Sequence, residues 1–174
     1  LAGSTFKKVY YDEIMQRTVS KFVPADDLIV PYSATSLDDA ETIIHVIKMT
    51  ENDLRKQQVG GFYRDIELTP GLDNETESQK KERELDGVSK TKDQRMFTLL
   101  ECHVDLDIEG FEDMNTQGEP TGIKLPYIVT IDEGSKEVLS IRRNYEVGDS
   151  TRSKVRYFVQ FKFLPGTGFY GFGL

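Results

Sequence analysis

Four residues of the stretch DLDIEGFEDMNT, which begins at Asp105, fall at positions used by a calcium-binding loop. Asp105, Asp107, Glu109 and Gly110 match positions 1, 3, 5 and 6, where carboxylates ligate the cation and a glycine permits a sharp turn. Position 12, where a bidentate glutamate closes such a loop, is Thr116. The preceding residues alternate like a strand, whereas a helix should lead into the loop. Asp105, Asp107 and Glu109 are therefore weak metal-ligand candidates, and the alternative is a strand that runs into an acidic loop.

The two histidines and the single cysteine offer little catalytic chemistry. Cys102 and His103 are neighbours on a predicted strand, so their side chains point to opposite faces and cannot form a thiolate–imidazolium pair. His45 lies inside an apolar strand pattern, which favours a half-buried ring with a satisfied hydrogen bond over a metal ligand. The glycines near the C-terminus lack the lysine and the following helix of a phosphate-binding loop. We therefore predict that the chain is not an enzyme, has no catalytic residues and binds no cofactor.

Charge and composition narrow the class of protein further. The 174 residues include 30 acids and 22 Lys or Arg, a net charge of −8 that does not attract a phosphate backbone. Two basic clusters, at 142–143 and 152–156, are interpreted as solvated strand ends. No apolar run approaches the ~20 residues of a membrane span. One cysteine excludes an internal disulfide framework, and a reducing cytoplasmic compartment is the default.

Alternation with a period of two dominates the sequence and predicts a strand-rich α+β fold. The ranges 6–23 and 125–145 are predicted to be antiparallel hairpins, turning near 12–16 and at 132–135. Two further strands are predicted at 42–49 and 97–108. In the range 155–163, alternate residues form an apolar face that we expect to be wholly buried: Val155, Tyr157, Val159, Phe161 and Phe163.

One or two short helices and a charged insertion complete the predicted organisation. Thr50 has the type of an N-cap, acids follow it, and Gly60–Gly61 stop the helix; a second turn is expected at 36–41. In the range 73–95, 13 of 23 residues are charged, which is typical of a flexible insertion or a surface helix near 75–86. The insertion divides the chain into an N-terminal part, 1–72, and an antiparallel β part, 96–174.

Both ends suggest a piece of a longer protein. The chain begins without methionine and ends on FLPGTGFYGFGL, in which four glycines and four large apolar or aromatic residues follow Pro165. Exposed termini are normally poorly ordered. We therefore expect Phe169, Tyr170, Phe172 and Leu174 to be poorly ordered or to pack on a neighbouring partner, with the glycines allowing close approach.

Several distinctive segments follow one another in an order typical of one family. They include FKKVYYDEIMQRTVSKFVPADDLIVPY, IIHVIKMTENDLRKQQVGGFYRDIEL, LLECHVDLDIEGFED, GIKLPYIVTID, VLSIRRNY and YFVQFKFLPGTGFYGFGL. In this order the chain resembles the middle of a portal protein, the head-to-tail connector of a tailed bacteriophage. The resemblance covers nearly the whole chain except 73–95, and its specificity lies in the ordered set, above all in Pro24–Tyr32 and Tyr157–Leu174.

The resemblance implies a non-enzymatic subunit of a ring, usually of twelve copies, at one vertex of the capsid in the virion. A separate terminase ATPase pumps double-stranded DNA through such a ring, tail proteins attach beneath it, and assembly takes place in the bacterial cytoplasm without a membrane. Within the subunit the chain resembles the outer, wing-like region, so no DNA contact is assigned to named residues. The alternative is a stand-alone, acidic, β-rich binding module that takes Ca²⁺ at 105–116.

Overall fold

The computed structural model describes residues 3–12, 15–68, 96–166 and 168–173. These residues form two antiparallel sheets, one α-helix and one short 3₁₀ helix. The fold is therefore α+β with strands in the majority, and this sequence-based prediction is confirmed. The predicted charged insertion at 73–95 lies outside the described residues.

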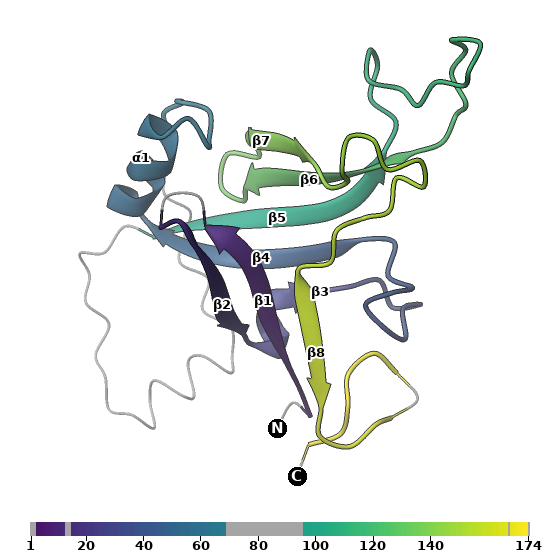
Figure 1. Ribbon diagram of the computed structural model, residues 1–174. Coiled ribbons are helices and arrows are strands. Elements are labelled where there is room, and N and C mark those ends of the chain that lie inside the picture. Colours follow the sequence, from purple (N-terminus) through teal and green to yellow (C-terminus); the bar gives the residue numbers. More distant parts are fainter. Residues whose placement is uncertain (1–2, 13–14, 69–95, 167, 174) are drawn as a thin grey trace.

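The larger sheet has five strands in the order β3-β4-β5-β6-β7 (Figure 1). Their bounds are Leu28–Ile29 for β3, Ile43–Thr50 for β4, Met96–Leu106 for β5, Leu125–Asp132 for β6 and Val138–Arg143 for β7. The predicted strands at 42–49 and 97–108 and the predicted hairpin 125–145 are confirmed. The hairpin turns where the Asp132 carboxylate accepts hydrogen bonds from the backbone N and the Oγ of Ser135, both at 2.7 Å.

The smaller sheet has three strands in the order β2-β1-β8. β1 (Ser4–Asp12) and β2 (Arg17–Val23) form the predicted N-terminal hairpin. The other edge of β1 pairs with β8 (Phe158–Lys162), so the two ends of the chain share one sheet. In Figure 1 this sheet lies across the front of the larger sheet. The 3₁₀ helix η1 (Ala25–Asp27) connects β2 to β3 and thus one sheet to the other.

The predicted helix is α1, Glu51–Val59. Thr50 caps it, because the Thr50 Oγ1 accepts a hydrogen bond from the backbone N of Asp53 at 3.2 Å. Gly61, at φ 73°, carries the backbone away after the last turn. The second turn predicted at 36–41 is present as a non-helical turn, in which Asp39 accepts hydrogen bonds from the backbone N of Ser36 and neighbouring donors. Among the described residues no helix is long and apolar enough to cross a lipid bilayer.

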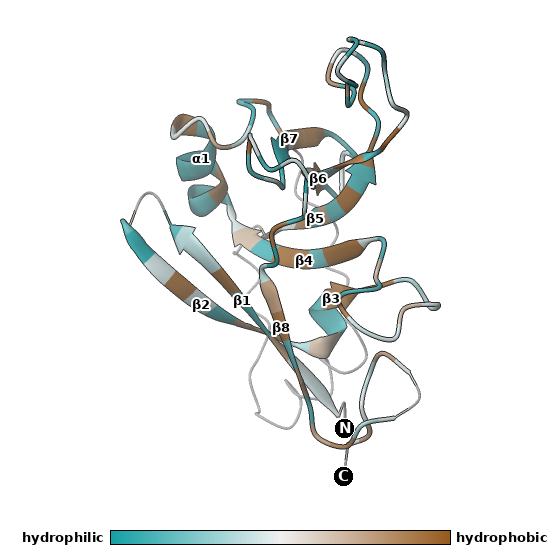
Figure 2. Ribbon diagram, turned by 45° about the vertical axis from the view of Figure 1, so that its right-hand side comes forward, coloured by the Kyte–Doolittle hydropathy of each residue, from teal (hydrophilic) through white to brown (hydrophobic). Residues whose placement is uncertain are grey.

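The main core lies where the small sheet meets the large one. It contains eight buried residues from both sheets and their connections: Phe6, Val23, Leu28, Ala34, Ala40, Ile43, Phe158 and Phe169. A second cluster joins α1 to the large sheet through Leu54, Tyr63, Phe97, Leu99 and Leu139. Figure 2 shows hydrophobic segments along β4 and β5, which contribute to these clusters. The core fixes the two sheets against each other.

The predicted buried face of the 155–163 strand is wrong. The regular strand β8 is shorter, and Val159, Phe161 and Phe163 are 47%, 50% and 62% exposed, whereas Phe158 is 8% exposed. The reason is the register, since β8 pairs with β1 so that Phe158 stands opposite Lys8 on the inner side. The inward Gln160 is satisfied there by a hydrogen bond from its Nε2 to the carbonyl of Phe169 at 2.7 Å.

The expectation that the C-terminal aromatic run needs an external partner is wrong for Phe169. This side chain is 5% exposed and stacks on Phe6 with the ring centroids 5.7 Å apart. The backbone N of Gly171 donates to the Oγ of Ser4 at 2.7 Å. A Cβ on Gly3 would overlap the backbone of Phe172, so the expected close approach of glycine backbone occurs within the chain itself. The side chain of Phe172 is 65% exposed.

Candidate functional site

The structure does not gather the three candidate metal ligands around one point. Asp105 lies near the end of β5, opposite Pro126, and lines a cavity of about 20 Å³, room for about one water molecule. Asp107 and Glu109 follow the strand and are exposed. In the described ranges, no group of three or more His, Cys, Asp or Glu side chains could hold a metal ion. The acidic segment therefore does not form the candidate metal site in the described ranges.

Residues 107–124 form a projection that we call the arm, which extends away from both sheets (Figure 1). At its tip, the Asn115 Oδ1 accepts hydrogen bonds from the backbone N of Gln117 and of Glu119, both at 2.9 Å. At its base, the buried Asp113 forms an ion pair with Arg152 and accepts a 2.7 Å hydrogen bond from the Oγ1 of Thr121. The arm is thus held by polar contacts of its own and by one ion pair with Arg152, which lies outside it.

The basic clusters have partners within the protein. Besides Arg152, Lys154 donates from its Nζ to the carbonyl of Ala40 at 3.1 Å, and Arg156 lies 2.9 Å from Asp38. The guanidinium of Arg142 lies over the ring of Phe62, 4.3 Å from its centroid. These residues lie at the end of β7 and ahead of β8, and the Arg156 side chain is 72% exposed, which agrees with the prediction of solvated strand ends. Their contacts also join the 144–157 segment and β7 to neighbouring elements.

A buried ion cluster lies between the two sheets and is centred on Glu101 of β5, which is 4% exposed. From β1, the Lys8 Nζ contacts the two carboxylate oxygens at 2.6 and 2.8 Å. From β5 itself, the His103 Nε2 lies 2.8 Å from the Glu101 Oε1, and because an ionised carboxylate only accepts, this nitrogen donates. Arg142 of β7 approaches to 3.9 Å. One carboxylate therefore connects three strands of two sheets.

Electrostatics keeps the Glu101 carboxylate charged. Burial alone would raise the pKa of Glu101, but the hydrogen bond from His103 and the attraction of Lys8 outweigh it and hold the pKa below its usual range. His45, opposite Glu101 on β4, has its pKa lowered to about 4, first by burial and then by the charge of Lys8. Among the described residues its Nδ1 has no hydrogen-bond partner, so the expectation of a satisfied ring is wrong.

The ion cluster was not predicted from the sequence, although the strand patterns contain a signal for it. Alternation in the first strand places Lys8 on the same face as Phe6, and alternation in β5 places Glu101 on the same face as Leu99 and His103. A lysine and a glutamate at inward positions predict a buried charge that needs a partner. The pairing itself joins residues 93 positions apart, which a local pattern cannot supply.

The outward side of the small sheet carries an apolar and basic surface, which we call the outer face. It consists of outward side chains from all three strands, all of them exposed: Thr5, Lys7, Val9, Tyr11, Phe22, Val159 and Phe161. Lys7 is central, since it pairs in register with both Phe22 and Val159 and lies 5.9 Å from the ring centroid of Phe161. None of these seven side chains is acidic.

The described residues therefore contain a rigid scaffold, an acidic projection and an apolar, basic sheet face. The surroundings of three neighbouring residues favour structural over catalytic roles. Burial raises the pKa of the Cys102 thiol, which makes it less reactive, and both Glu101 and His103 belong to the ion cluster. An exposed apolar sheet face is typical of a surface that meets another protein. The geometry thus favours a protein that works through contacts with other proteins.

Comparison with known proteins agrees with this interpretation. A family model described as Phage SU10 portal protein matches residues 4–114, more than half of the chain. The match begins with β1, includes β2 to β5, α1 and Glu101, and ends within the arm. A search of curated proteins gives no match. The resemblance to phage portal proteins is confirmed, and the chain belongs to the phage SU10 portal protein family.

Proposed function

We propose that the chain is the outer, wing-like region of a subunit of a phage portal ring, through which double-stranded DNA is packaged and ejected. The observation that carries this proposal is the family match, which covers β1 to β5 and therefore part of each sheet. Because the chain belongs to a portal protein family, it has a structural role at the portal vertex of the virion. The proposal goes further in naming a ring of about twelve copies and its contacts with capsid, terminase and tail proteins.

The organisation of the fold supports a structural role over a catalytic one. Strands from residues 1–72 and from 96–174 pair with each other in both sheets, through β1–β8 and β4–β5. This pairing supports the proposal that the two parts form one wing-like region. The Glu101 cluster adds a charged contact between the two sheets.

The charge of the chain fits passage of DNA without adhesion. A net charge of −8 repels a phosphate backbone, so a ring built from such subunits does not bind passing DNA non-specifically. We propose that DNA passes the ring without specific contacts from the described residues. The contacts that hold the ring in place are then protein–protein contacts.

Negative-stain electron microscopy of the native polypeptide that contains this chain tests the proposal. We expect rings with a central hole and close to twelve-fold symmetry. Compact single particles at micromolar concentration would overturn it. An appropriate control is the same polypeptide in high salt, which reports how far charge contributes to assembly.

A further inference from the structure

We propose that neighbouring subunits meet through two particular surfaces: the arm of one copy docks on the outer face of the next. This inference rests on the proposed function, because it assigns the subunit contact within the ring. It commits to one occupant for the outer face, a second copy of this chain.

The outer face has the features of an unoccupied docking surface. Its apolar side chains are unusually exposed for a sheet, with Phe22 at 64%, Phe161 at 50% and Val159 at 47%. They surround a single charge, Lys7, and no acidic side chain lies among them. Burial of these groups against a partner is favourable, because it removes apolar surface from water. A partner that suits this face presents apolar side chains together with acids.

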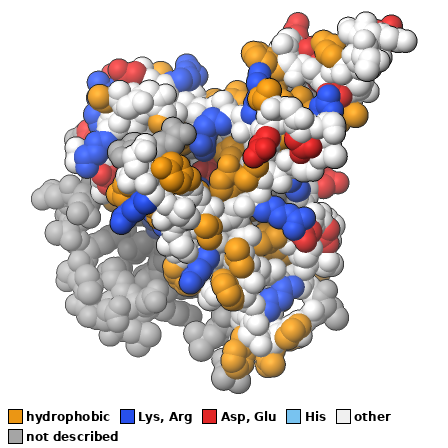
Figure 3. Space-filling view, viewed as in Figure 1, with side chains coloured by type: hydrophobic (Ala, Val, Ile, Leu, Met, Phe, Trp, Pro, Cys, Tyr) orange, Lys and Arg blue, Asp and Glu red, His pale blue; other side chains and the backbone are white. Residues whose placement is uncertain are grey.

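The arm presents that combination. It carries exposed apolar side chains, with Phe111 at 58%, Ile123 at 54% and Met114 at 46%. Among them stand exposed carboxylates, of which Glu109 and Glu119 are the clearest, and the basic residue of the arm is Lys124 at its end. Figure 3 shows acidic and hydrophobic side chains on the projection, and hydrophobic and Lys or Arg side chains interleaved over the small sheet. The two surfaces are complementary in charge and in apolar character.

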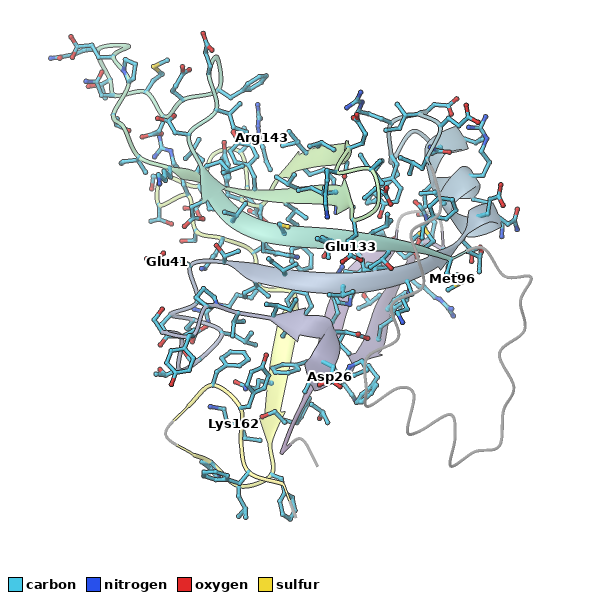
Figure 4. All side chains as sticks on the ribbon, turned by 180° about the vertical axis from the view of Figure 1, so that it is seen from behind. Asp26, Glu41, Met96, Glu133, Arg143 and Lys162 are labelled. Atoms are coloured by element: carbon cyan, nitrogen blue, oxygen red, sulfur yellow. The ribbon has the colours of Figure 1, made fainter. Side chains whose placement is uncertain are left out.

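The two surfaces cannot meet within one copy. The arm and the small sheet extend toward opposite ends of the molecule (Figure 1). Seen from behind, Lys162 of β8 likewise lies at the end away from the arm (Figure 4). A surface pair of this kind is heterologous, so each copy offers one half to each neighbour, and the contact repeats until a ring closes. In a closed ring, head-to-tail docking therefore covers the outer face of every subunit.

Site-directed cross-linking on native rings tests the contact directly. One copy carries Phe111→Cys, another carries Val159→Cys, and a short bismaleimide is added after the two are mixed and assembled. We expect a cross-linked dimer only in the mixture, and a ladder of oligomers when both cysteines stand on one chain. Ile141→Cys, which is 52% exposed on β7 and belongs to neither surface, replaces Val159→Cys as the matched control. The unmodified chain controls for reaction at Cys102.

Charge reversal gives an independent readout that needs no cross-linker. Lys7→Glu places an acid opposite the acidic arm, so we expect the protein concentration needed for half-maximal assembly to rise at least tenfold. Adding Glu109→Lys and Glu119→Lys to the same chain should recover most of the loss. Arg143→Glu and Glu133→Lys, exposed changes on β7 and on the β6–β7 turn, are the matched controls and should change assembly less than twofold.

The outcomes separate this inference from the proposed function. Rings that form normally but give no Phe111–Val159 cross-link, together with normal assembly of Lys7→Glu, would overturn the docking and leave the portal ring intact. Absence of rings in the unmodified polypeptide would overturn the proposed function itself. If a cysteine variant fails to fold, Met114→Cys and Phe161→Cys report on the same contact, and the charge-reversal series does not depend on either.

Discussion

Glu101 shows how a single buried residue can join two layers of a fold. A buried carboxylate is tolerated only when partners replace its hydration, and here Lys8 and His103 do so within 2.8 Å. Replacing a whole buried ion pair with apolar residues is often neutral, whereas removing one partner leaves an uncompensated charge. The cluster is therefore evidence for a specific arrangement of the sheets more than for a large gain in stability.

Removal of one partner should be far more harmful than removal of both. We expect Glu101→Leu to lower the free energy of unfolding by about 3–5 kcal/mol, because Lys8 then stays buried without a counter-charge. The double variant Lys8→Met/Glu101→Leu should recover most of this loss. Urea denaturation measures both. Arg156→Met, which removes the exposed pair with Asp38, is the control and should cost below about 1 kcal/mol. Equal stability of the single and double variants would contradict this account.

His45 should make the stability of the protein depend on pH. Its pKa is about 4 in the folded chain against an ordinary value of 6.5, because burial and the nearby Lys8 disfavour its charged form. The unfolded chain therefore binds more protons between these values, and stability falls as the pH drops from 6.5 toward 4, by on the order of 3 kcal/mol. Glu101, whose folded pKa is lowered, adds a further loss below its unfolded value of 4.5.

The variant His45→Phe isolates this contribution, since it keeps an aromatic ring beside Phe158 and cannot titrate. We expect its unfolding free energy to vary less than that of the unmodified chain between pH 6.5 and 4. Urea titrations at half-unit pH steps give the comparison. Parallel curves for the two proteins would show that another group is responsible.

At the scale of elements, local sequence patterns predicted most of the strands and the helix that form. They predicted much less well which side chains of those strands face the core. The hairpins follow from alternation, and α1 follows from Thr50 and the double glycine. Which face of β8 points to the core could not be predicted, because both of its faces contain aromatic residues. Only the pairing with β1 places Phe158 on the inner side. The buried place of Phe169 likewise depends on Phe6, far away in the sequence.

Two aromatic residues of the C-terminal run provide a matched test of this packing. Phe169→Ala should lower the free energy of unfolding by about 3–5 kcal/mol, because it empties a position stacked on Phe6 in the main core. Phe172→Ala, three residues on and 65% exposed, should change it by no more than about 0.5 kcal/mol. Thermal or urea unfolding of the two variants measures the difference. Similar losses would mean that the run packs differently from the structure.

At the scale of the whole molecule, charge is distributed unevenly. Acids concentrate on the arm, while Lys7 and its neighbours make the small sheet basic in an otherwise acidic chain. The acidic stretch was visible in the sequence, and its spacing suggested a bound cation. A linear pattern does not reveal that a complementary basic surface lies on other strands of the same chain. The family match and the fold together favour contacts between copies over a bound metal.

Calcium should therefore leave the folded state unchanged. We expect the melting temperature to stay within about 1 °C when millimolar CaCl₂ replaces a chelator, since a ligand stabilises only by binding the folded chain. The charge-neutralised variant Asp105→Asn/Asp107→Asn should behave in the same way. Differential scanning fluorimetry is sufficient for this comparison, with MgCl₂ at equal ionic strength as the control. A calcium-specific rise that disappears in the variant would restore the binding-module hypothesis.

The pairing of β1 with β8 has a consequence for the time course of synthesis. The hairpin β1–β2 can form as soon as it leaves the ribosome, but one edge of β1 must wait for a strand that begins at Phe158. At about 5–20 residues per second, this interval is on the order of 10 to 30 seconds. During it an unpaired strand edge next to exposed aromatic side chains is open to wrong partners. A nascent chain of this kind benefits from a chaperone or from fast translation, which shortens the interval, and crowded copies of it are prone to aggregate before the sheet closes.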